Sequence, residues 1–258
     1  MSTGLLFLMA GACGVLALLV IPFFGFAVTT SWAHLQPVRG DFESVWVSVW
    51  YTLLALLVII AIGTPLSYWL ARSSFRGKVF VEALVLLPLL TPPLAMGILL
   101  AMFYGPYSWA GRVAGTLGVE LTNTPAAFVL AQVYAAAPYF VAAARSAFEV
   151  VDPELEQISL TLGKSAWQTF WRITLPLARL GLVVGIAIAW VRALGEFGIV
   201  LIIAYFPQGI PVKLWVNLQD IGLSAVYPLL WLFFVVAMPL PLVLGIASRR
   251  YLSSPEAI

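Results

Sequence analysis

Six long apolar runs constrain the fold of this chain more than any other feature. They cover residues 4–28, 44–70, 80–104, 125–148, 181–206 and 225–247. Each reaches the roughly 20 residues that a helix needs to cross about 30 Å of hydrocarbon. The runs are continuous, whereas membrane strands alternate apolar and polar residues, so strands are disfavoured. We therefore predict an all-α integral membrane protein, with one transmembrane domain of six spans over residues 1–258.

The charge content supports a membrane protein over a soluble one. Charged residues make up 9% of the chain and hydrophobic residues 62%. A soluble domain carries about 25% charged residues. Too few charges are therefore present to cover a surface that faces water on all sides.

The basic residues predict the orientation of the spans. If both termini are cytoplasmic, the inner segments hold more Lys and Arg than the outer loops, as the positive-inside rule requires. The inner ones are Arg72, Arg76, Lys78, Arg145, Lys164, Arg172, Arg179, Arg249 and Arg250, the outer ones Arg39, Arg112 and Lys213, and Arg192 falls inside a span. The basic residues follow topology, so the net charge of +2 indicates no nucleic-acid partner.

Catalytic and metal sites have little support in the sequence. Cys13 is the single cysteine and His34 the single histidine, which argues against thiolate clusters, zinc-peptidase spacing and histidine triads. Gly163 to Ser165 resembles the end of a phosphate-binding loop, but Ile158 stands where that loop needs its first glycine. The amino-terminal run is expected to be a retained helix, because it lacks the positive lead of a signal peptide. We predict no catalytic, metal or nucleotide site in this chain.

A polar segment over residues 149–180 interrupts the apolar runs. Asp152 and Pro153 start a short helix that Gly163 ends, and a second amphipathic piece follows that Leu175 and Pro176 are expected to end. An exposed apolar face would be a liability without a partner. This face is predicted to comprise Leu155, Ile158, Leu162, Trp167 and Phe170. The segment therefore predicts a platform on which a soluble protein docks.

Two charged residues fall inside the fifth run. Arg192 is predicted near the midplane, about 16 Å along the helix from Gly181 at 1.5 Å per residue. A charge there costs about 2.5–3.5 kcal/mol on insertion scales. Glu196 shares its face at i,i+4 and can neutralise it. Two interpretations stay open: an internal ion pair that holds the bundle, or a face that lines or closes a water-accessible path.

Prolines break the third run at Leu87–Gly97, which reads LPLLTPPLAMG. Pro92 and Pro93 remove backbone donors, and Thr91 offers a hydroxyl at the break. Helices interrupted at mid-depth are typical of transport pathways. A bend that merely improves packing is the alternative.

Three of these segments, in this order, resemble permease subunits of molybdate, tungstate and sulfate ABC importers. They are LPLLTPPLAMG, the loop from Asp152 to Pro176, and Arg192–Gly198, which reads RALGEFG. The resemblance implies the type I importer permease fold in a bacterial or archaeal inner membrane. It also implies a homodimeric pore, an extracytoplasmic oxyanion-binding protein, and two ATP-binding subunits that carry ATP and Mg.

The resemblance assigns two groups of residues. Contacts to the ATPase are implied for Asp152, Glu156, Gln157, Gly163, Trp167, Leu175 and Pro176. The translocation path or gate is implied for Thr91, Pro92, Pro93, Arg192 and Glu196. One departure stands out, because Gln157–Ser159 reads QIS where the family has Glu-Ala-Ala. The charged contact to the ATPase is therefore expected to move to Glu156 or to be lost.

Alternatives remain at two levels. Within the importers, molybdate or tungstate is the expected cargo and sulfate or thiosulfate the alternative, and the residues alone do not decide between them. In another class, a secondary transporter would work without ATP and would need ion-coupling residues and internal repeats, neither of which is clear in the sequence. An intramembrane enzyme lacks a nucleophile–base pair.

Overall fold

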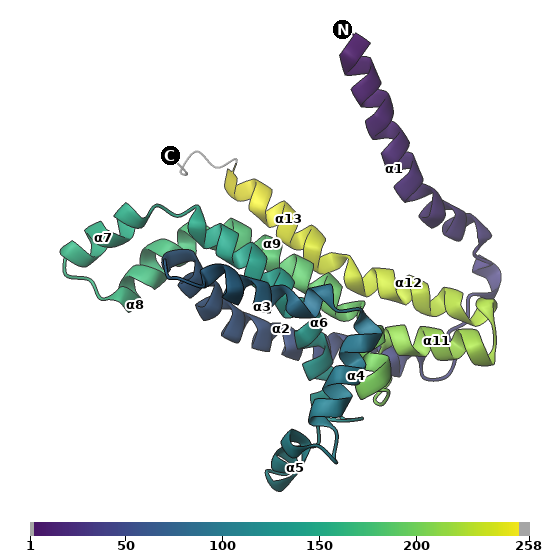
Figure 1. Ribbon diagram of the computed structural model, residues 1–258. Helices are drawn as coiled ribbons and strands as arrows, with labels where there is room; N and C mark the ends of the chain where they lie inside the picture. Colours follow the sequence, from purple (N-terminus) through teal and green to yellow (C-terminus); the bar gives the residue numbers. More distant parts are fainter. Residues whose placement is uncertain (1–2, 253–258) are drawn as a thin grey trace.

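The computed structural model describes residues 3–252, without the side chains of residues 3–8, 34 and 247–252. All regular structure in this part of the chain is helical, which confirms the predicted class (Figure 1). The helices are α1 (Thr3–Thr29), α2 (Asp41–Arg72), α3 (Lys78–Leu90), α4 (Pro93–Tyr104), α5 (Trp109–Thr116), α6 (Pro125–Glu149), α7 (Pro153–Thr161), α8 (Ala166–Thr169), α9 (Leu175–Leu194), α10 (Gly198–Ile203), α11 (Ile210–Asp220), α12 (Val226–Ala237) and α13 (Pro239–Leu252). Short 3-10 turns η1 (Trp32–His34) and η3 (Leu223–Ala225) and the π-helix η2 (Phe170–Thr174) complete the described elements.

Five helical stretches in the described chain are long and apolar enough to cross a membrane. They are Met9–Thr29, Asp41–Arg72, Pro125–Glu149, Ala166–Leu194 and Leu223–Ile246. Helices α3 and α4 make a sixth if they count as one span, although they are bent by 105° at the break between them. Every apolar run of the sequence therefore corresponds to a helical stretch.

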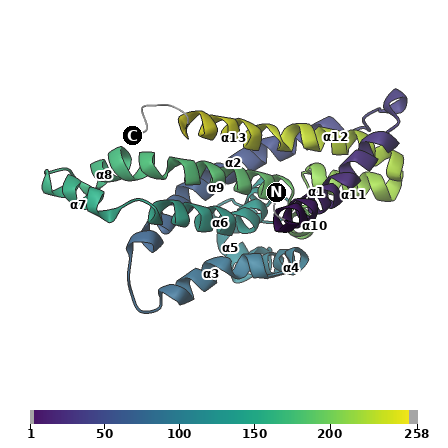
Figure 2. The ribbon, with the colours of Figure 1, turned by 90° about the horizontal axis from the view of Figure 1, so that it is seen from above.

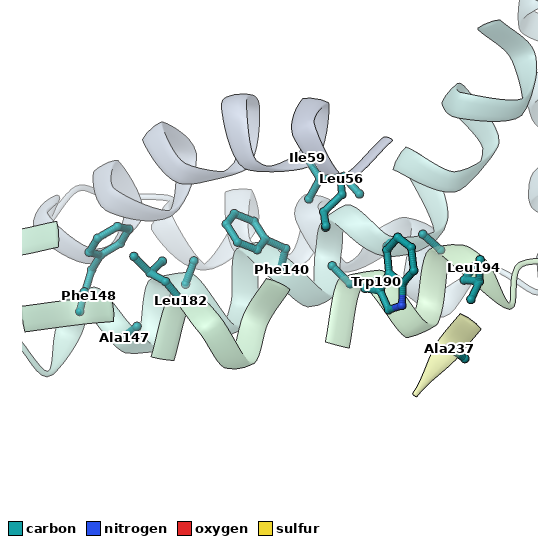
Figure 3. Packing of buried hydrophobic residues seen from close by; sticks show 14 of the residues in the cluster. Leu56, Ile59, Phe140, Ala147, Phe148, Leu182, Trp190, Leu194 and Ala237 are labelled. Carbon is teal, nitrogen blue, oxygen red and sulfur yellow. The ribbon is translucent and has the colours of Figure 1, made fainter. Parts of the chain in front are cut away.

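Helices α2, α6 and α9 form the centre of the bundle. Helices α3 and α4 flank it on one side and α12 and α13 on the other (Figure 2). In the core, Leu56 and Ile59 of α2 lie near Phe140 of α6, beside Leu182 and Trp190 of α9 (Figure 3). Small residues let these helices approach closely. A Cβ on Gly63, for example, would lie 2.7 Å from a ring carbon of Phe140.

Helix α1 leaves the bundle at an angle (Figure 1). None of its most apolar stretch is buried in the single chain. Its carboxyl end is anchored, where Phe26 stacks on Trp231 with ring centroids 4.8 Å apart. The Trp231 indole also donates to the Thr30 hydroxyl at 3.1 Å.

The fifth span differs from its prediction at both ends. A continuous helix over 181–206 was expected, but α9 ends at Leu194 and α10 begins at Gly198. The expectation that Leu175 and Pro176 end the platform helix is also wrong, because α8, η2 and α9 run on as one stretch. Pro176 lies in the first turn of α9, where a missing N–H is tolerated. The π-turn before it widens the helix, with the Leu175 N–H bonded to the Phe170 carbonyl.

The connections between α4 and α6 and between α10 and α12 contain two helices that the sequence analysis did not predict, α5 and α11. Helix α11 packs beside α2 and α12. The opposite end of the molecule is held by ion pairs, with Arg145 2.9 Å from Glu82 and 2.8 Å from Glu149. The predicted cytoplasmic placement of Arg249, Arg250 and the two termini concerns side chains and residues outside the described part of the chain.

Candidate functional site

A helix-turn-helix, here called the platform, is built by local capping signals. It comprises α7, the turn at Gly163 and α8. The Asp152 carboxylate caps α7 by accepting from the Glu154 N–H at 2.9 Å. Gly163 then ends α7 with φ 81°, and the Lys164 N–H bonds the Ser159 carbonyl in a Schellman arrangement. Ser165 and Gln168 start α8 with a reciprocal capping box.

The outward face of the platform is apolar and exposed. Its members are Leu155, Ile158, Leu162, Trp167 and Trp171. The most exposed of them are Leu162, at 75%, and Trp167, at 70%. Gln157 is also exposed, and its side chain is neutral. Phe170, expected on this face, is half-buried and packs edge-on against Tyr68 with centroids 5.1 Å apart. Trp171, in η2 just after α8, instead contributes an exposed ring beside Trp167.

The inward face of the platform is polar. Glu156 is buried and contacts Arg72 of α2 at 2.8 Å and the Thr174 hydroxyl at 2.6 Å. Ser159 and Thr169 bond through their hydroxyls at 2.9 Å and so tie α7 to α8. The usual amphipathic pattern is thus reversed here: polar groups fasten the platform to the bundle and apolar groups point away from it.

A second cluster forms where two broken spans meet, and we call it the break cluster. It contains Thr91, Pro92, Pro93, Arg192 and Glu196. Thr91, Pro93 and Arg192 all line one cavity of about 160 Å³. Helices α4 and α10 pack tightly beside it, since a Cβ on Gly198 would lie 2.6 Å from the Pro93 Cβ. The structure therefore brings together two motifs that lie about 100 residues apart in the sequence.

The charged pair of the break cluster bridges α9 and α10. Arg192 lies in the last turn of α9, and its Nη1 is 2.5 Å from Glu196 Oε2. Glu196 Oε1 accepts from the Ile199 N–H at 2.8 Å, in the first turn of α10. The Glu196 side chain is 1% exposed and that of Arg192 28%. The carboxylate is thus enclosed, while the guanidinium remains accessible from the cavity.

Some residues of these two sites escaped the sequence analysis. Gln132 of α6 donates to the Ala193 carbonyl at 3.1 Å and to the Thr52 hydroxyl at 2.7 Å, beside the end of α9. Tyr139 lines the cavity, with its ring centroid 6.0 Å from the Arg192 guanidinium carbon. An isolated polar residue inside an apolar run was the available signal for Gln132. For Arg72, the sequence indicates the topology but not the ion pair with Glu156, which lies 84 residues away in the chain.

Comparison with known proteins matches residues 63–254 to the family described as binding-protein-dependent transport system inner membrane component. A probable molybdenum ABC transporter permease protein of Haloferax volcanii is 43% identical over 175 residues, 68% of this chain and 64% of that protein. The match thus spans somewhat less than two thirds of that relative's length. A molybdate/tungstate transport system permease protein of Pyrococcus furiosus is 32% identical over 196 residues, 76% of this chain and 74% of that protein.

A solved structure shares the fold. It is the bacterial alginate ABC transporter in complex with an alginate pentasaccharide-bound periplasmic protein. One of its chains superposes with a TM-score of 0.75 at 17% identity, covering 97% of this chain and 96% of that one. At this identity the likeness concerns the fold, which is that of an importer permease.

Proposed function

Because the chain belongs to the family of binding-protein-dependent transport system inner membrane components, we propose that it forms part of the pore of an ATP-driven oxyanion importer. The proposed cargo is molybdate or tungstate, since the Pyrococcus furiosus relative is named for molybdate/tungstate and the Haloferax volcanii relative for molybdenum. The chain is a multi-pass protein of the inner membrane. Its termini are proposed to be cytoplasmic, in keeping with the basic residues around the platform.

The observation that carries the proposal is the platform. A helix pair fastened to the membrane bundle by polar contacts exposes Trp167 and Leu162 at 70% and 75%. An apolar patch of this kind, rimmed by polar residues, marks a protein interaction site. We assign this patch to the ATP-binding subunit, which would supply ATP, Mg and the hydrolysis that this chain does not perform. Asp152 and Gly163 cap α7 and so shape the patch, and Gln157 lies at its edge. Leu175 and Pro176, in the first turn of α9, are proposed to carry the docking movement into the span.

Two copies of the chain are proposed to enclose the path. The face of α9 next to Arg192 exposes apolar side chains such as Val184 and Ile188, at 52% and 43%. Arg192 lies between this face and the cavity of the break cluster, since it lines an open pocket on α9 as well. A partly exposed guanidinium is costly against lipid. A second copy over this face would place it in a shared interior with Thr91, Pro92, Pro93 and Glu196.

The transport cycle then follows from the connection of the platforms to the bundle. ATP binding would close the two ATPase subunits and draw the platforms together, because each platform is seated on one of them. The displacement would reach α9 through the continuous helix from Ala166 to Leu194 and open the pore toward a binding protein that delivers the anion. Hydrolysis would reverse the movement. Selectivity would lie mainly with the binding protein.

The test is the ATPase activity of the chain reconstituted with its ATP-binding subunit and binding protein. Molybdate, tungstate and sulfate are titrated separately, and stimulation by molybdate or tungstate is the expected result. Replacing Gly163 by Val forces a β-branched residue to φ 81° and should abolish stimulation. Gly115→Val is the matched control, since Gly115 is in α5 and has nothing within 4 Å of its added Cβ.

The outcomes separate the competing functions. Stimulation by sulfate alone would reassign the cargo and keep the importer class. A chain that binds no ATP-binding subunit would refute the proposal, and ion-driven uptake without ATP would then establish a secondary transporter.

A further inference from the structure

Glu156 occupies a polar junction between the platform and the two central spans. Both carboxylate oxygens accept from Arg72 Nε, at 3.2 and 3.0 Å, and Oε1 also accepts from Arg72 Nη2 at 2.8 Å. The Thr174 hydroxyl donates to Oε1 at 2.6 Å, and the Tyr68 hydroxyl approaches Oε2 at 3.4 Å. Glu156 is only 8% exposed. Its carboxylate thus joins α7 to the end of α2 and to the π-turn that leads into α9.

Few other contacts fix α7 to the spans. Helix α7 packs mainly on α8 and η2, within and next to the platform. Its remaining large side chains, including Leu155, Ile158 and Leu160, are exposed. Arg72 strengthens the link on the bundle side, because its Nη2 also donates to the Val151 carbonyl at 3.0 Å. The direct path from α7 to α2 therefore runs through this ion pair.

We propose that Glu156 is a positioning residue for transport, which makes the platform, α2 and α9 move as one body. The inference rests on the proposed function, in which an ATPase displaces the platform. Displacement of α7 would pull α2 through Arg72 and α9 through Thr174. Charge-assisted bonds of this multidentate kind hold a fixed geometry, and a partly buried acid is costly to leave without its partner. These bonds thus resist bending between α7 and the two central spans, which is where the proposed movement of the platform would reach the bundle.

The junction also explains the departure at Gln157. Gln157, which is exposed, is neutral, and the acid one residue earlier, Glu156, faces the bundle. The charge of Glu156 is neutralised by Arg72 within the chain. We therefore assign to Glu156 an internal coupling role and to the neutral apolar patch the contact with the ATPase.

The experiment compares Glu156→Gln with Glu154→Gln in the full complex with ATPase and binding protein, in proteoliposomes. Glu154 is the matched control, because it is an exposed acid in the first turn of the same helix and its side chain is not part of the junction. Basal ATPase activity, its stimulation by loaded binding protein, and anion imported per ATP are measured. In Glu156→Gln, import per ATP should fall at least about fivefold, the lower end of typical coupling effects. Glu154→Gln should match the wild-type chain.

Arg72→Lys keeps the charge but loses the multidentate fork, and should give an intermediate import per ATP. It also carries the test if Glu156→Gln fails to assemble. A bond with only a structural role would lower the yield of complex and leave import per ATP unchanged. Wild-type import per ATP in assembled Glu156→Gln, or in Arg72→Lys, would overturn the inference. A wild-type chain without stimulated ATPase would instead refute the proposed function, and this inference with it.

Discussion

Replacing Gly198 by Ala should drive apart the two broken spans of the break cluster. The added Cβ would lie 2.6 Å from the Pro93 Cβ and 3.1 Å from both the Pro93 carbonyl carbon and the Leu94 nitrogen. Carbon atoms prefer separations of about 3.5–4.0 Å, so the helices must part by roughly 1 Å. The obstacles are a proline ring and helix backbone, neither of which can rotate away.

Overpacking of this kind costs about 1–3 kcal/mol. For a chain of this size that corresponds to a fall in Tm of about 2–12 °C, at roughly 2–4 °C per kcal/mol. The assay is thermal unfolding of the purified chain in detergent, followed by size-exclusion of the surviving monodisperse protein. Import activity of the same variant should fall as well, since the displaced helices line the proposed path.

Gly195→Ala is the matched control within the same motif. Its Cβ would meet only the Val191 carbonyl oxygen at 3.3 Å and a Phe233 ring carbon at 3.8 Å. Both variants remove a glycine from the same break and share the entropic gain of doing so. The difference between their Tm values therefore isolates the close approach to Pro93. Equal Tm values would refute the claim that Gly198 is there for packing.

Three further predictions concern the charged pair and the platform. Arg192→Ala should destabilise the chain by about 3–5 kcal/mol, because it leaves the enclosed Glu196 carboxylate without its partner. Glu196→Ala should cost less, because the Arg192 guanidinium is partly exposed, and the double variant should lose clearly less than the sum of the two. A double-mutant cycle by thermal unfolding measures this, and additive losses would contradict it. Ser165→Ala removes a capping bond of α8 worth about 1 kcal/mol. The adjoining turn should then be cleaved faster by a protease, and an unchanged cleavage rate would contradict the prediction. Trp167→Ala should weaken binding of the ATPase about tenfold or more without lowering the Tm. Trp109 of α5 is 73% exposed, so Trp109→Ala is the control and should leave binding unchanged. Equal effects of the two variants would argue against the platform as the docking site.

Much of the fold follows from local sequence signals. The apolar runs predict helices because a helix satisfies its own backbone bonds in lipid. The platform was also predictable in outline, since Asp152, Gly163 and Ser165 supply caps whose chemistry is local. The break in the third span follows from Pro92 and Pro93, which cannot donate backbone bonds.

The remaining features depend on contacts between distant segments. Gly195 and Gly198 are local stop signals for α9, but glycines are also tolerated inside membrane helices, so they do not decide the matter alone. The stop is stabilised by Glu196, which accepts from the Ile199 N–H in the first turn of α10. Leu175 and Pro176 predict a helix end. In the structure a π-turn precedes Pro176, and the helix continues through it as one stretch to Leu194. The inward orientation of Glu156 could not be derived from α7 alone, because its partner Arg72 lies on another helix.

The most direct test of the account is uptake of labelled molybdate into proteoliposomes that hold the chain and its ATP-binding subunit, with binding protein outside and ATP inside. The account predicts uptake that requires both ATP and the binding protein, and that unlabelled tungstate suppresses. Uptake that continues without ATP, or that follows an imposed ion gradient instead, would contradict it.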